Sequence, residues 1–114
     1  MNLKLAENSL TCKISPDDLQ QLEAGQRLRM ALPTRPLAIG LEILQDGQQP
    51  HFAATNSGQT IDLILTLPKE ALALLRNIGR NRDGIRLMSG GLELIVQVDI
   101  RNDKRPRQEA AQAS

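Results

Sequence analysis

Residues 61–78 read IDLILTLPKEALALLRNI and carry the signals of both a strand and a helix. Apolar residues occupy every second position over 61–67, which is the period of a half-buried strand. From Pro68 onward the apolar residues recur at helical spacing, and Glu70 suits the positive end of a helix dipole. The stretch therefore predicts a strand followed directly by an amphipathic helix that ends before Gly79.

The same two signals recur along the rest of the chain. Apolar residues also alternate with others at residues 2–5, 10–15, 27–32, 37–43 and 92–100. A second helix start, at Ser15 and Pro16, precedes a short leucine stripe that ends at Gly25. Since parallel strands are usually apolar on both faces, the alternation favours antiparallel pairing. We therefore expect an α+β fold: one strongly twisted or partly closed antiparallel sheet of about six to eight strands, with two helices covering its apolar face.

Each predicted helix lies between two strands and has the same layout, with a proline, an acidic first turn, a leucine stripe and a glycine. Shared helix-start chemistry explains most of this likeness, and an internal duplication with a pseudo-twofold repeat is the alternative. Apolar periodicity is lost over residues 104–114, which are polar and rich in alanine. The sequence therefore predicts a single domain over residues 1–103 and a disordered C-terminal tail over residues 104–114.

The composition argues against several classes of function. One histidine, one cysteine, one phenylalanine and no tyrosine or tryptophan leave little for a familiar catalytic constellation or an aromatic nucleic-acid platform. A net charge of +1 argues against nucleic-acid and membrane-surface partners, whose binding relies on excess positive charge. The single Cys12 permits no intramolecular disulfide, and no apolar run reaches the roughly 18 residues of a membrane helix. We expect a cytoplasmic protein without a signal peptide.

Four arginines around two glycines are the best candidate for an anion site. They are Arg76, Arg80, Arg82 and Arg86. Guanidinium groups suit phosphate or carboxylate ligands, and the alternative is that these are solvated arginines of an exposed turn. A zinc site needs at least three protein ligands, and His51 and Cys12 are the only residues of their types. We therefore predict no catalytic residue, no metal and no cofactor.

Three branched aliphatic residues interrupt the otherwise polar phase of their strands. They are Leu44, Ile64 and Ile95. If their strands are neighbours, these side chains form an apolar surface patch, and such patches usually have a partner. A symmetric homodimer is the commonest partner, so we predict self-association through these residues. The alternative is that the sheet curls and hides them beneath a loop or the tail.

Several short runs resemble a family of small uncharacterised bacterial proteins. The runs are MNLKL at 1–5, NSL at 8–10, ISPDDL at 14–19, FAA at 52–54, IDLILTLP at 61–68 and LIVQVDI at 94–100. Members of that family open with a basic strand, an Asn-Ser-Leu/Ile step, a second strand and a short helix. The resemblance implies the strand-and-helix order and, because the family has no established activity, assigns no functional residue.

Together these patterns favour a non-enzymatic binding or assembly module that acts through self-association. The alternative is an enzyme or sensor domain that binds a small anionic ligand, a phosphate or a carboxylate, through the arginines. A thermal-shift screen separates the two, because a ligand that binds only the folded chain raises its stability.

Overall fold

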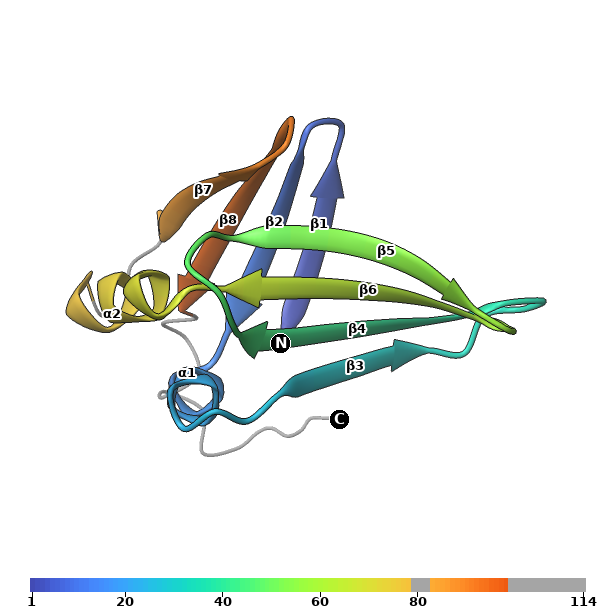
Figure 1. The fold of residues 1–114 in the computed structure, drawn as a ribbon, viewed down its shortest axis with the longest axis horizontal. Coiled ribbons are helices and arrows are strands. Elements are labelled where there is room, and N and C mark those ends of the chain that lie inside the picture. The colour runs from blue at the N-terminus through green and yellow to red at the C-terminus, as the bar shows by residue number, and fades with distance from the viewer. Residues whose placement is uncertain (79–82, 99–114) are drawn as a thin grey trace, which may run out of the picture.

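The computed structural model describes residues 1–78 and 83–98 and contains two helices and eight strands in that part of the chain. In chain order these are β1 (Asn2–Ala6), β2 (Ser9–Ile14), α1 (Pro16–Glu23), β3 (Leu28–Leu32), β4 (Ala38–Gln45), β5 (His51–Ser57), β6 (Thr60–Leu67), α2 (Lys69–Ile78), β7 (Ile85–Ser89) and β8 (Leu92–Val98). Sheet A has the strand order β1-β2-β8-β7, and sheet B has the order β3-β4-β6-β5. The two sheets cross, and both helices lie at the same end of sheet B (Figure 1).

The predicted α+β class with two helices is confirmed, whereas the prediction of one antiparallel sheet is wrong. The strands divide into two four-stranded sheets, and each sheet is mixed. Its two central strands run parallel, as β2 with β8 and β4 with β6. Alternation is compatible with parallel pairing here because each sheet buries only one face. The usual rule assumes parallel sheets that are covered by helices on both faces.

The two sheets follow one pairing pattern. Each sheet consists of two antiparallel hairpins whose inner strands pair in parallel. Sheet A joins the hairpin β1–β2 to β7–β8, and sheet B joins β3–β4 to β5–β6. Corresponding rows across the sheets are Leu3–Cys12–Val96–Ile85 in sheet A and Phe52–Leu65–Ile43–Leu28 in sheet B. The chain thus passes twice through the order hairpin, helix, hairpin. An ancestral duplication remains a prediction, and the predicted tail over 104–114 lies outside the described residues.

Both helices form where the sequence predicts them, but the apolar stripe of α2 is only partly buried, because Leu74 and Ile78 are 50% and 39% exposed. The Ser15 hydroxyl accepts the backbone N–H of Asp18, and the Asp18 carboxylate accepts the N–H of Ser15, each at 3.0 Å. This reciprocal capping box satisfies two backbone donors that the first turn of α1 leaves unpaired. Leu19 and Leu22 of α1 and Leu75 of α2 are buried in the core that both sheets share.

Alternation gives each sheet an inner and an outer face. In sheet B, Leu28, Ile43 and Leu65 belong to the buried core. Their neighbours in sequence, such as Arg29 and Ile64, lie in the opposite phase on the outer face. No helix or strand of the described chain covers this outer face (Figure 1). The outward side chains of β3, β4 and β6 are therefore accessible to a binding partner on this open face.

Leu65 and Val96 are each 1% exposed in the shared core, as their strand phase predicts. Truncating either residue to alanine should lower the free energy of unfolding by roughly 2–4 kcal/mol, because buried contacts are lost and a cavity remains. Urea unfolding measures the loss. Leu74→Ala is the matched control, since Leu74 is 50% exposed on α2 and should lose much less. A loss below about 1 kcal/mol at both core sites would contradict the assigned faces.

Candidate functional site

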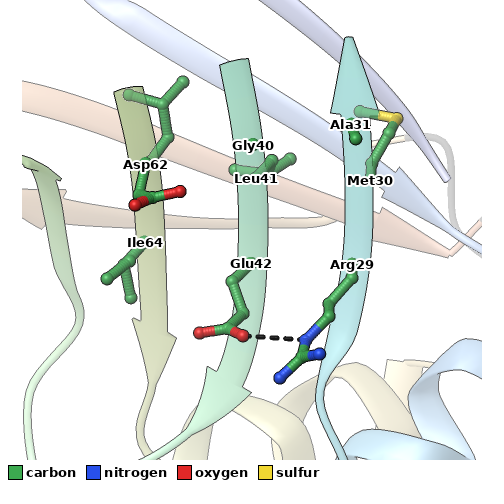
Figure 2. A pocket seen from close by; sticks show the side chains of 9 residues that line it. Arg29, Met30, Ala31, Gly40, Leu41, Glu42, Asp62 and Ile64 are labelled. Atoms are coloured by element: carbon green, nitrogen blue, oxygen red, sulfur yellow. Dashed lines mark hydrogen bonds and ion pairs between the residues drawn. The ribbon is translucent and has the colours of Figure 1, made fainter. Parts of the chain in front are cut away.

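A shallow pocket of about 500 Å³ lies on β3, β4 and β6 (Figure 2). Its lining residues are Arg29, Met30, Ala31, Gly40, Leu41, Glu42, Asp62, Leu63 and Ile64. The hollow lies over Gly40, whose missing side chain leaves the middle of β4 uncovered. A Cβ atom at Gly40 would lie 3.2 Å from the Asp62 Oδ1 atom, so a larger residue would crowd this carboxylate. Glycine inside a strand often marks such a close approach.

Strand register places the polar residues of the pocket in two neighbouring rows. Glu42 pairs with Arg29 on β3 and with Ile64 on β6. In the next row, Gly40 pairs with Ala31 and Asp62. The pocket is therefore a strip of the outer face. On β3 it has the guanidinium of Arg29, and on β4 it has the carboxylate of Glu42 and the empty position at Gly40. On β6 it has the aliphatic side chain of Ile64 and the carboxylate of Asp62.

The two carboxylates of the pocket differ in their partners. Glu42 accepts hydrogen bonds from Arg27 Nη1 at 3.1 Å and from Arg29 Nε at 3.0 Å. Figure 2 shows the Glu42 carboxylate turned toward Arg29. Asp62 makes no hydrogen bond or ion pair with any other residue that the structure describes. The β3–β4 side thus has one unneutralised positive charge, and β6 has one unneutralised negative charge.

The structure separates the three residues predicted for self-association. Leu44 and Ile64 lie on the outer face of sheet B, on the paired strands β4 and β6, and both are half-buried. Ile95 lies on β8 in sheet A, where it pairs with Thr11 and Arg86. The strands of Leu44 and Ile64 are neighbours, whereas Ile95 belongs to the other sheet, and self-association stays a prediction.

Two of the four predicted anion-binding arginines fall within the described residues. Arg76 on α2 donates from Nε to Glu23 Oε2 at 3.2 Å and from Nη2 to Oε1, so it joins α2 to the end of α1. Arg86 on β7 donates to Glu93 on β8 at 3.1 Å. The two arginines therefore bind different carboxylates, on α1 and on β8.

Arg80 and Arg82, the other two predicted arginines, lie outside the described residues. The anion site therefore stays a prediction.

The chain's single cysteine and histidine have different environments. Burial raises the pKa of the Cys12 thiol to about 12, so the thiol is protonated at neutral pH. His51 is exposed on β5. Among the described residues, no three His, Cys, Asp or Glu side chains are grouped so that they could hold a metal ion. Over the same residues, no helix has the length and apolar character needed to cross a membrane.

Sequence reasoning missed Gly40 and Asp62 as site residues. Both left a signal: a glycine inside an alternating strand, and a lone aspartate in the outer phase of β6. Their adjacency depends on the parallel pairing of β4 and β6, which the alternation did not predict.

Comparisons with known proteins found no family model, no curated protein and no solved structure that matches this chain. The resemblance to small uncharacterised bacterial proteins stays a prediction. The function is therefore argued from the site itself.

Cys12 predicts a loss of stability at alkaline pH. The ordinary pKa of the thiol is 9.0, and burial raises it to about 12 in the folded chain. Between these values the unfolded chain releases a proton that the folded chain keeps, so stability falls as pH rises above 9.0. By urea unfolding between about pH 8 and pH 11, the wild type should lose about 2–3 kcal/mol more than Cys12→Val. Equal losses would contradict a buried, protonated thiol.

The ion pair between the helices predicts a measurable change at Glu23. The hydrogen bond from Arg76 lowers the pKa of the Glu23 carboxyl below its usual 4.5. Stability from this pair is present above pH 4.5 and is lost as pH falls through the lowered pKa. In Arg76→Gln, an NMR titration should show the Glu23 pKa rising toward its usual value. Arg86→Gln is the control, and an unchanged Glu23 pKa in Arg76→Gln would show that the pair does not form in solution.

Proposed function

We propose that this protein is a binding or assembly module that forms a homodimer through the outer face of sheet B. The observation that carries the proposal is the position of Leu44 and Ile64. These two aliphatic side chains share one face on paired strands, and no described helix or strand covers that face. Contiguous apolar patches on an exposed surface often mark an interaction site, and Leu44 and Ile64 provide the apolar part of this one.

The surroundings of Ile64 support a protein partner. On β5, Ala53 pairs with Ile64, and its short side chain leaves that flank of Ile64 open. On β4, the ion pair between Glu42 and Arg29 forms a polar border. An aliphatic centre with a charged border is the usual composition of a protein interface. A homodimer uses the same patch twice, so one patch suffices for a closed assembly.

The proposal assigns no reaction to the site. Glu42 is already held by two arginines, and the buried Cys12 thiol is protonated. We also place this homodimer in the cytoplasm, where a single buried thiol stays reduced.

Light scattering coupled to size-exclusion chromatography tests the proposal. The wild type should have the mass of a dimer at high micromolar concentration. Ile64→Lys should be a folded monomer, because dimerisation would bury an unpaired ammonium group. Ile95→Lys is the matched control: the same substitution on the outer face of sheet A should leave the dimer intact.

Two outcomes would count against this surface. A wild type that is monomeric at high micromolar concentration has no such homodimer. A dimer that Ile95→Lys disrupts and Ile64→Lys does not would move the interface to sheet A. Thermal melting of each variant verifies that the chain still folds.

A further inference from the structure

Opposite charges on the outer face of sheet B occupy different strands. Arg27 and Arg29 share the single carboxylate of Glu42, and their side chains remain 53% and 72% exposed. Asp62 on β6 makes no hydrogen bond or ion pair with the described residues. The face therefore has a positive side at β3 and a negative side at β6.

Within the described residues of one copy, these charges do not neutralise one another. β3 and β6 lie on either side of β4, so two strand spacings of about 10 Å in total separate them. Arg29 and Asp62 also lie in successive rows of the sheet, because Arg29 pairs with Glu42 and Asp62 pairs with Gly40. The sheet geometry thus holds the guanidinium and the carboxylate apart.

Arg29 keeps donors for a second carboxylate. The structure records one hydrogen bond from its guanidinium, donated by Nε to Glu42. A guanidinium has five N–H donors, so both terminal nitrogens remain able to bind a carboxylate in a forked geometry. Asp62 provides a carboxylate whose oxygens have no recorded donor within the described chain.

We infer that the partner on this face is a second copy of the chain, with Asp62 of each copy bound by Arg29 of the other. A two-fold axis that lies in the interface plane, passes over β4 between Gly40 and Glu42 and runs obliquely to the strands places Arg29 of one copy opposite Asp62 of the other. A surface with one side of each sign is complementary to itself under such an axis. The inference rests on the proposed function, and it specifies which charges pair across the homodimer and how the two sheets are aligned.

The hollow over Gly40 fits this arrangement. It lies between the two sides, at the place where the axis would cross, and the missing side chain removes a protrusion there. The axis places the hollows of the two copies opposite each other, which leaves room for each Arg29 side chain to reach Asp62 of the other copy, and Ile64 of each copy provides apolar contact. Exclusion of water from the interface strengthens the two charge pairs.

A charge-exchange experiment tests the pairing. Asp62→Arg and Arg29→Asp each place like charges opposite one another in a homodimer, so each should weaken self-association by roughly tenfold or more. An equimolar mixture of the two variants restores both pairs. Sedimentation velocity and native mass spectrometry should therefore show a heterodimer whose dissociation constant is close to that of the wild-type dimer.

The controls apply the same charge changes elsewhere on the surface. Lys4→Asp on β1 and Glu7→Arg in the following turn change exposed residues away from sheet B, and both should leave the dimer intact. The dissociation constant of the wild-type dimer should also rise several-fold from low salt to about 1 M NaCl, because salt screens the pairs. This measurement needs no variant and so holds even if a substitution prevents folding.

The outcomes separate this inference from the proposed function. A wild-type dimer that resists salt and both charge reversals overturns the charge pairing and leaves self-association standing. Two weakened variants that do not combine into a heterodimer also overturn it. A wild type that is monomeric at high micromolar concentration overturns both.

Discussion

The parallel pairing of strands distant in sequence is the constraint on which this structure depends. β2 lies beside β8, and β4 lies beside β6, so each sheet joins a hairpin from one half of the chain to a hairpin from the other half. An isolated hairpin is marginally stable in water, and the central pairs convert four hairpins into two sheets. They also bring the buried rows of both halves into one core.

The same pairing builds the outer face of sheet B. Because Ile43 and Leu65 pair in register and point into the core, their alternate neighbours must lie together on the opposite face. Glu42 and Ile64 are brought together in this way, and so are Gly40 and Asp62. The pocket is a direct consequence of core formation, since the burial of one phase of β4 and β6 determines the position of the other phase.

Electrostatics then distinguishes this face from an ordinary polar surface. Two arginines share one glutamate, and Asp62 has no partner among residues 1–78 and 83–98, so opposite charges remain on either side of β4. Exposed pairs of this kind contribute little to the stability of the folded chain. They become informative about recognition, because charges that stay unpaired among the described residues favour a partner with the complementary arrangement.

Local signals in the sequence determined the elements of this protein. The proline, acid and leucine patterns at Ser15 and Pro68 specified both helices, and alternation identified the buried phase of the central strands, as at Leu65 and Val96. These features depend on residues a few positions apart, so periodicity and capping chemistry suffice to predict them. Alternation did not identify β5 or β7, and Leu5 and Leu32 on the apolar phase of β1 and β3 are 69% and 54% exposed.

Only the tertiary structure decided how the strands pair and therefore which side chains meet. A strand shows the same alternation of apolar and polar residues whether the fold has one sheet or two. The alternation specifies neither which strand lies beside it nor the direction of that neighbour. For this reason the sequence predicted Leu44 and Ile64 as outward aliphatics and could not separate them from Ile95, nor place Asp62 beside Gly40. The elements followed from local chemistry, whereas the site followed from strand pairs whose partners lie far apart in the chain.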